Sequence, residues 1–178
     1  DCEWLDARTA LTARPDGGIS GYVDADCDHA PDKKLQKRFV SDVVLTQGFI
    51  AGREDGDTAL LGRGGSDTSA AYFAAKLQAE RLEIWTDVPG FFSADPRLTG
   101  SARQIKALSY DEAQEIASMG ASVLHPRAIP PVRNAGIKME IRCTHKRKLP
   151  GTVISATPSE DAPRLKAVSV KNGVRLIT

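Results

Sequence analysis

The sequence predicts a layered α/β domain with a mainly parallel sheet. Two short β-branched runs, residues 42–46 and 82–85, have the apolar pattern of strands that are buried on both faces of a parallel sheet. Between them, residues 67–80 repeat apolar side chains at helical spacing, and Ser66 or Asp67 can cap the first turn. A strand, a helix and a strand in this spacing predict a βαβ unit.

The N-terminal part of the chain is predicted to begin with a strand and to continue as a loop. Residues 3–7 have a strand-like composition. Residues 14–34 are rich in Gly, Asp and Pro and show little periodicity, which is typical of a loop or a mobile flap. We expect weak order in this segment.

Further elements are predicted in the second half of the chain. Ser109 and Glu112 have the spacing of a capping box, at the start of a helix that ends near Gly120. Another helix is predicted over residues 126–135, with Pro in its first turn, and a strand follows over residues 138–142.

The C-terminal residues have a different composition. Residues 156–163 are rich in Thr, Pro, Ser, Glu and Asp, as linkers are, and residues 166–178 alternate apolar and polar side chains as a strand does. We therefore expect one domain over residues 1–155, and a linker with the first strand of a second domain over residues 156–178.

Composition and charge disfavour several classes of protein. With 41% hydrophobic and 26% charged residues, the 178 residues have the size and mix of one globular domain. The net charge of +1 disfavours general binding to nucleic acid or to anionic membranes. No apolar run reaches the roughly 18 residues of a membrane span, and no signal peptide is apparent. We expect a soluble, cytoplasmic protein.

The cysteines and histidines give little indication of a site. Cys2, Cys27 and Cys143 are odd in number and widely spaced, which argues against a disulfide framework and against a zinc site. No histidine pairs with a second ligand at metal spacing. The basic run over residues 145–148 is interpreted as a solvated loop rather than as an anion site. We expect no metal-binding residues in this chain, and no covalent catalysis.

The most informative segment is Leu-Gly-Arg-Gly-Gly-Ser-Asp at residues 61–67, a glycine-rich loop that enters a helix. Free N–H groups and the positive end of the helix dipole favour an anion there. The guanidinium of Arg63 suits a carboxylate, and Asp67 can hold a metal or a lysine. The loop is not a Walker A motif, because no Gly-Lys-Ser/Thr ends it. A tight structural turn is the alternative interpretation.

Two further segments are candidates for nucleotide contacts. Residues 86–90, Thr-Asp-Val-Pro-Gly, follow a predicted buried strand at the end where open α/β sheets bind ligands. Asp87 can accept from a ribose hydroxyl, although the segment considered alone is better interpreted as an ordinary turn. Residues 95–97, Asp-Pro-Arg, can bring a cation near phosphates, and the alternative is common loop material.

Taken together, several segments closely resemble the aspartate kinases of the amino acid kinase family. They are residues 44–50, 61–67, 84–90 and 119–126. The resemblance extends from Trp4 to Ile154 in matching order and spacing. It implies the C-terminal portion of an amino acid kinase-like three-layer sandwich with a mainly parallel sheet, followed by the first strand of an ACT-like regulatory domain. Residues 14–34 also resemble aspartate kinases that are fused to diaminopimelate decarboxylase.

This resemblance implies a reaction. The γ-phosphoryl group of MgATP is transferred to the side-chain carboxylate of L-aspartate, giving 4-phospho-L-aspartate, the first step of lysine, threonine and methionine biosynthesis. A carboxylate with a reference pKa of about 4 is already ionised, so the enzyme's task is to position two anions and to neutralise charge. The implied cofactors are ATP and Mg²⁺. The implied partners are these small molecules and further copies of an allosteric parent protein, without nucleic acid or membrane.

The resemblance also implies two groups of site residues. The substrate loop is Arg63, Gly64, Gly65, Ser66 and Asp67, with Arg63 on an aspartate carboxylate and Asp67 organising the catalytic centre. The nucleotide positions are Thr86, Asp87, Phe92, Arg97, Ser122 and Val123. Phe92 stands where the family often has Tyr, and Ser122 where it usually has Lys, which puts a hydroxyl and a cationic contact in doubt.

Two alternatives remain open at this stage. One is another amino acid kinase, acting on glutamate, acetylglutamate or a nucleoside monophosphate, and the other is a non-catalytic nucleotide-binding module. The family's N-terminal Lys-Phe-Gly-Gly motif has no counterpart in these residues. We therefore expect the N-terminus to be a boundary within a longer protein. We also expect the chain alone to lack activity and to self-associate through exposed apolar edges.

Overall fold

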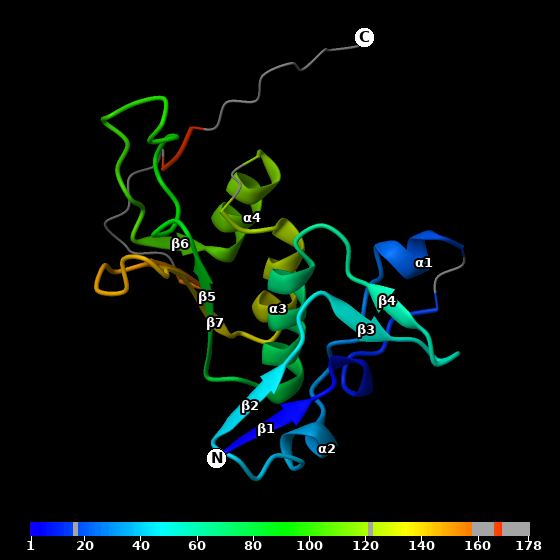
Figure 1. Cartoon of the computed structure of the whole chain (residues 1–178). Coiled ribbons are helices and arrows are strands. Elements are labelled where there is room, and N and C mark those ends of the chain that lie inside the picture. The colour runs from blue at the N-terminus through cyan, green and yellow to red at the C-terminus, as the bar shows by residue number, and fades with distance from the viewer. Residues whose placement is uncertain (16–17, 121–122, 158–165, 169–178) are drawn as a thin grey trace. The chain divides into compact units, whose positions relative to one another are not determined.

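A computed structural model describes residues 1–15, 18–120, 123–157 and 166–168 (Figure 1). The chain divides into two compact units. Unit 1 consists of Asp1–Leu82 and Arg127–Ile137, and unit 2 consists of Glu83–Pro126 and Lys138–Thr178. Within the described ranges, no helix is long and apolar enough to cross a membrane.

Unit 1 contains two small sheets and the longest of the described helices. In the first sheet, β1 (Cys2–Leu5) and β2 (Val43–Thr46) run parallel, with Trp4 opposite Leu45 (Figure 1). In the second, β3 (Ile50–Gly52) and β4 (Thr58–Leu60) run antiparallel. The helices of unit 1 are η1 (Ala7–Thr9), α1 (Ser20–Val23), α2 (Lys33–Gln36), α3 (Gly65–Leu77) and α5 (Ile129–Asn134).

Unit 2 is built on a four-stranded sheet in the order β5-β7-β8-β6. Its strands are β5 (Arg81–Thr86), whose first residues belong to unit 1, β6 (Ala107–Ser109), β7 (Lys138–Cys143) and β8 (Thr152–Ser155). Strand β8 runs parallel to β6 and antiparallel to β7. Helix α4 (Tyr110–Ser118) follows β6, and η2 (Pro126–Ala128) leads from unit 2 into α5.

The α/β fold class is confirmed. The strands predicted over residues 42–46, 82–85 and 138–142 are β2, β5 and β7. The predicted βαβ unit is wrong in its pairing within the described residues. There β2 pairs with β1, β5 belongs to the other sheet, and the β3–β4 hairpin, which was not predicted, precedes α3.

The prediction that β2 is buried on both faces is also wrong for the described residues. Leu45 is 58% exposed and its partner Trp4 is 59% exposed. The physical reason is that this two-stranded sheet packs only its other face. There Leu5 and Val44 contact a small apolar cluster that includes Leu35.

Helix α3 is confirmed, but its ends and its buried face differ from the prediction. Neither Ser66 nor Asp67 caps it, because the N-cap is Gly64, in the left-handed conformation at φ 68°. The helix ends before Gln78, whose left-handed backbone donates to the carbonyls of the preceding turn. In the predicted apolar stripe, Ala74 is buried but Ala70, Phe73 and Leu77 are only half-buried. The buried residues of α3 are Gly65, Thr68, Ser69, Ala71, Tyr72, Ala74, Ala75 and Lys76.

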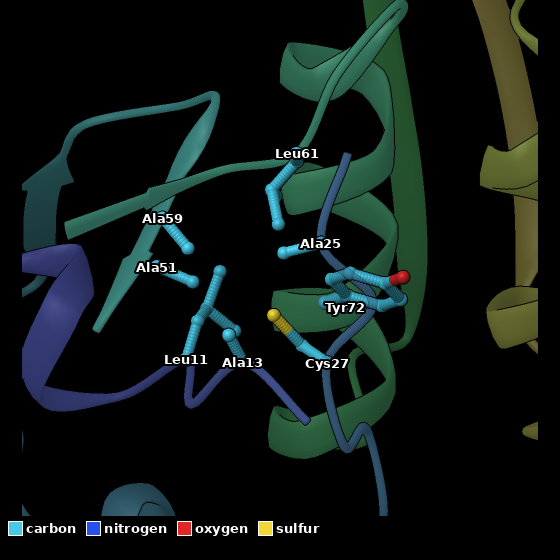
Figure 2. Packing of buried hydrophobic residues seen from close by; sticks show 8 residues of the cluster. All are labelled: Leu11, Ala13, Ala25, Cys27, Ala51, Ala59, Leu61 and Tyr72. Carbon is cyan, nitrogen blue, oxygen red and sulfur yellow. The ribbon is translucent and has the colours of Figure 1, made fainter. Parts of the chain in front are cut away.

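The segment predicted as a weakly ordered flap instead supplies part of the core, in its described residues 18–34. It contains α1 and α2, and it contributes Ala25 and Cys27 to a buried cluster (Figure 2). The full cluster is Leu11, Ala13, Ala25, Cys27, Ala51, Ala59, Leu61 and Tyr72. Residues 24–28 read Asp-Ala-Asp-Cys-Asp, so apolar and acidic side chains alternate, as in an extended segment with one buried face.

The acidic side chains of this alternating segment bind partners on other elements. The hydroxyl of Tyr72 donates to Asp26 and points away from the apolar cluster (Figure 2). Burial and this carboxylate raise the pKa of Tyr72 above its usual value. Asp26 also lies 3.2 Å from a guanidinium nitrogen of Arg14, and Asp28 lies 4.0 Å from the ammonium of the buried Lys76. The contacts with Tyr72 and Lys76 hold the segment against α3.

The capping box that was predicted for α4 is confirmed. The Ser109 hydroxyl accepts from the Glu112 amide at 3.2 Å, and the Glu112 carboxylate accepts from the Ser109 amide at 2.7 Å. The Lys166 ammonium lies 2.7 Å from the same carboxylate. Glu112 therefore caps the start of α4 and also anchors Lys166.

A buried threonine fixes the loop that follows β5. The Thr152 hydroxyl accepts from the Phe91 amide at 2.9 Å and donates to the Ile105 carbonyl at 2.6 Å. Gly90 has a φ of 130°, and a side chain there would lie 2.9 Å from the Cβ of Thr152. Only glycine suits this position, because both the backbone conformation and the space exclude a Cβ.

The third predicted helix is confirmed with a tighter start: Pro126 begins a 3₁₀ turn, η2, and α5 follows. Gly136, just after its end, has a φ of 67°. The predicted linker and ACT-like strand fall mainly on residues 158–165 and 169–178, which lie outside the described residues.

A first prediction concerns Glu112. Burial raises its pKa, but the hydrogen bonds from Lys166 and Ser109 outweigh burial and hold the pKa below the ordinary 4.5. Because the folded-state pKa is the lower one, the ionised carboxylate stabilises the fold above about pH 4.5, and this stabilisation is lost as the pH falls. We expect Glu112→Gln to lower the free energy of unfolding at pH 7 and to have progressively less effect below pH 4.5.

Urea denaturation at a series of pH values measures this difference. Glu115→Gln, at an exposed position on the same helix, is the matched control and should follow the wild type at every pH. A Glu112→Gln deficit that stays constant down to pH 3 would contradict the ion-pair explanation.

A second prediction concerns Thr152. Thr152→Val keeps the shape of the side chain but leaves the Phe91 amide and the Ile105 carbonyl without the hydroxyl, so we expect a loss of about 1–3 kcal/mol in the free energy of unfolding. Thr152→Ser keeps the hydroxyl and should cost less. Urea denaturation of both variants is the measurement, and equal losses would show that the hydroxyl does not hold the loop.

Candidate functional site

The glycine-rich loop and the loop after β2 meet at the first turn of α3. The Leu61 amide donates to the Phe49 carbonyl at 2.9 Å, and the Phe49 amide donates to the Ser69 hydroxyl at 3.2 Å. Within the glycine-rich loop, the Gly65 amide donates to the Gly62 carbonyl at 3.0 Å. The two loops are therefore one hydrogen-bonded unit rather than two independent turns.

Close packing reinforces this arrangement. A side chain at Gly48 would lie 3.3 Å from the Ser69 hydroxyl and 3.4 Å from the Ser66 hydroxyl, and a side chain at Gly65 would collide with the ring of Phe49. Phe49 itself has a φ of 75°, a conformation that non-glycine residues rarely adopt. Strained backbone of this kind clusters at ligand sites.

The structure places the predicted substrate residues together at this helix start. Arg63 and Ser66 are exposed, Gly64 and Asp67 are half-buried, and Gly65 is buried. The positive end of the helix dipole lies beside the exposed guanidinium. This combination favours binding of a carboxylate or a phosphate group.

One residue of this region was missed by sequence reasoning. The guanidinium of Arg127 donates to the Leu61 carbonyl at 2.8 Å and to the Ala25 carbonyl at 2.7 Å, and it forms an ion pair with Asp24. The sequence does show a basic residue directly after His125-Pro126, at a predicted helix start. Its spacing, however, does not indicate that its partners are the carbonyls of Leu61 and Ala25, which are distant in sequence.

The predicted nucleotide residues Thr86 and Asp87 lie at the end of β5, in unit 2. The Thr86 carbonyl accepts from both the amide and the hydroxyl of Thr144, at 2.9 and 3.0 Å. The Asp87 carbonyl accepts from the buried Cys143 thiol at 3.3 Å. The backbone at this strand end is therefore fixed by the residues that end β7, while the Asp87 carboxylate is exposed and accepts from the Thr86 hydroxyl at 3.1 Å.

The other predicted nucleotide residues are placed less favourably. Phe92 is half-buried, and its backbone forms an isolated antiparallel β-bridge with Gln104. Its neighbour Phe91 is the ring that is fully buried. Arg97 is 84% exposed and binds Asp95 at 2.8 Å. Hydrogen bonds from the Arg97 side chain and amide lower the pKa of Asp95. The Arg97 side chain uses its Nε and one terminal nitrogen for this pair.

The remaining candidates add little. Val123 is half-buried, and Ser122 lies outside the described residues. The basic run over residues 145–148 is exposed, as the solvated-loop interpretation predicts. Where the structure is described, no group of three or more His, Cys, Asp or Glu side chains is placed to hold a metal ion. All three cysteines are free thiols.

Comparisons with known proteins agree with the family resemblance. Residues 2–143 match the sequence profile of the amino acid kinase family. The chain is 41% identical over 164 residues to the chloroplastic bifunctional aspartokinase/homoserine dehydrogenase 2 of Arabidopsis thaliana, covering 90% of this chain and 18% of that protein. It is 34% identical over 176 residues to the lysine-sensitive aspartokinase 3 of Escherichia coli, covering 99% of this chain and 39% of that protein.

A solved structure gives the same result. E. coli aspartokinase III, in complex with aspartate and ADP, matches the fold with a TM-score of 0.81 at 33% identity, over 93% of this chain and 37% of that one. The chain thus spans less than two fifths of the length of each of these relatives. The profile match covers most of the chain, and the chain therefore belongs to the amino acid kinase family.

Proposed function

We propose that the protein containing this chain is an aspartate kinase, which transfers the γ-phosphoryl group of ATP to the side-chain carboxylate of L-aspartate. The observation that carries the proposal is the loop over residues 62–66, which presents an exposed Arg63 at the start of α3 and is braced by the strained loop at Phe49. The relatives described above are aspartokinases, which favours aspartate over other substrates of the family.

The loop at α3 is the proposed aspartate subsite. The planar guanidinium of Arg63 can bind a carboxylate through two parallel hydrogen bonds, and the helix dipole adds to the attraction. Gly64 and Gly65 let the ligand approach the backbone, and Ser66 supplies a hydroxyl. Asp67, half-buried in the first turn, organises the catalytic centre.

The end of β5 is the proposed nucleotide subsite. The exposed carboxylate of Asp87 can accept from the ribose hydroxyls, and Thr86 holds that carboxylate through its own hydroxyl. Arg97, whose guanidinium is paired with Asp95, is proposed to contact phosphate. The flanking contacts are proposed for Phe92, Ser122 and Val123. Mg²⁺ would arrive with the phosphates of ATP, as magnesium usually does in kinases.

Several wider features belong to the same proposal. E. coli aspartokinase III has been solved with aspartate and ADP and also with lysine and aspartate, which supports ATP and aspartate as ligands and control by an amino acid. We propose a cytoplasmic, homo-oligomeric parent protein that acts early in lysine biosynthesis, with its catalytic domain ending near residue 155 and an ACT-like domain following. Fusion to diaminopimelate decarboxylase stays a prediction, whereas the Arabidopsis relative is joined to homoserine dehydrogenase.

The proposal is tested first by assaying the full-length protein for phosphoaspartate, trapped as its hydroxamate. A panel of aspartate, glutamate, acetylglutamate and nucleoside monophosphates as acceptors distinguishes aspartate kinase from other members of the family. ATP binding without transfer to any acceptor would instead indicate a non-catalytic nucleotide-binding module.

A third prediction concerns Arg63 in the full-length enzyme. Arg63→Lys replaces a bidentate fork by a point charge, so the KM for aspartate should rise by about tenfold, as expected for the loss of one charge-assisted hydrogen bond. The KM for ATP should change less. Steady-state kinetics with each substrate varied is the measurement.

The matched control is Arg38→Lys, an exposed arginine of unit 1 whose side chain donates to the Thr9 hydroxyl. It should leave both KM values unchanged. An unchanged aspartate KM in Arg63→Lys would remove Arg63 from the aspartate subsite.

A fourth prediction concerns Asp87. Asp87→Ala removes the acceptor for the ribose and should weaken ATP binding by about tenfold, while aspartate binding stays near the wild-type value. Asp87→Asn keeps one acceptor oxygen and should be affected less. Calorimetric titration with ATP is the measurement, and an unchanged affinity in Asp87→Ala would return the segment to the ordinary-turn interpretation.

A further inference from the structure

We propose that Arg127 is a positioning residue, which fixes the glycine-rich loop so that Arg63 is held ready for the substrate carboxylate. Arg127 does not need to touch the substrate for this role. The inference deepens the proposed function and rests on it, because the ligand of the loop is taken to be aspartate.

The contacts of Arg127 join two chain segments that are remote in sequence. One guanidinium nitrogen donates to the Leu61 carbonyl at 2.8 Å, and the other terminal nitrogen donates to the Ala25 carbonyl at 2.7 Å. The same guanidinium is paired with the Asp24 carboxylate. The Ala25 amide donates in turn to the Leu60 carbonyl at 2.9 Å, so Arg127 closes a small network across both segments.

This network acts on the peptide group at the entrance of the loop. The Leu61 carbonyl belongs to the peptide bond that leads into Gly62, the residue directly before Arg63. Asp24 also packs against Gly62, where an added Cβ would lie 2.9 Å from its carboxyl carbon. A planar guanidinium that holds a carbonyl on each side fixes the plane of this peptide group and thereby the direction in which the loop leaves β4.

The charges show why positioning is favoured over direct binding. The Arg127 side chain is 28% exposed, and its charge is balanced by Asp24. Arg63, in contrast, is exposed at the helix start. The two arginines therefore have different roles: Arg63 is the group proposed to meet the substrate, and Arg127 holds the backbone that carries it.

The test uses the full-length protein with Arg127→Lys, which keeps the charge but cannot span both carbonyls and the carboxylate in one plane. We expect amide hydrogen exchange of residues 62–66 to become about tenfold faster without ligand, since a charge-assisted contact is lost. The KM for aspartate should rise by about tenfold, while the KM for ATP and kcat stay within about twofold. Arg38→Lys should behave as the wild type in every measurement.

Asp24→Asn is the milder second variant, and it keeps the proposal testable if Arg127→Lys folds poorly. It should shift loop exchange and aspartate KM in the same direction by about threefold, and it should add nothing in the double variant, because both changes break one network. We call the contacts of Arg127 with Leu61, Ala25 and Asp24 the clamp. Unchanged exchange of residues 62–66 in both variants would refute the proposal that the clamp fixes the loop. Faster exchange with an unchanged aspartate KM would overturn its role in affinity.

The hydrogen-exchange arm separates this inference from the proposed function. If the full-length protein transfers phosphate to no acceptor, aspartate kinase activity is refuted, yet faster exchange confined to residues 62–66 still upholds the clamp. A general rise in exchange throughout unit 1 would instead show that Arg127 only stabilises the fold, and the positioning role would be rejected.

Discussion

The placement of Leu61 is the constraint on which the rest of unit 1 depends. Its side chain is fully buried in the apolar cluster. Its amide donates to the Phe49 carbonyl, and its carbonyl accepts from the Arg127 guanidinium. The hydrophobic core, the strained loop and the clamp therefore meet in a single residue. The glycines of the loop follow Leu61 directly. The peptide group between Leu61 and Gly62 therefore links the position of the loop to the packing of the core of unit 1.

Local signals made helices α3, α4 and α5 and several strands predictable from sequence. The capping box at Ser109 and the apolar runs of β5 and β7 depend on residues near one another in the chain. The core role of residues 24–28 could not be predicted, since its partners Tyr72 and Arg127 lie far along the chain. The alternation of acids with Ala25 and Cys27 was a signal, but it is too short to stand out within a loop-like composition.

The candidate site was predictable to the extent that its residues are consecutive. Arg63 and Asp67 share one motif, and the structure places them in one helix start. Arg127 and Thr152 escaped prediction because both act through the backbone groups of distant residues, and no pattern of side chains records this. The partner of Arg97 was visible in the sequence two residues away, yet only the structure shows that Asp95 occupies its guanidinium.

The buried position of Cys27 has a chemical consequence. Burial, with the charge of Asp26 as a smaller contribution, raises the pKa of its thiol to about 12, so at neutral pH the sulfur stays protonated and unreactive. Cys2, in contrast, is exposed. A thiol reagent that reaches Cys27 must wait for residues 24–28 to leave the core. The rate at which a thiol reagent modifies the native Cys27 therefore reports how often residues 24–28, which Arg127 contacts, leave the core.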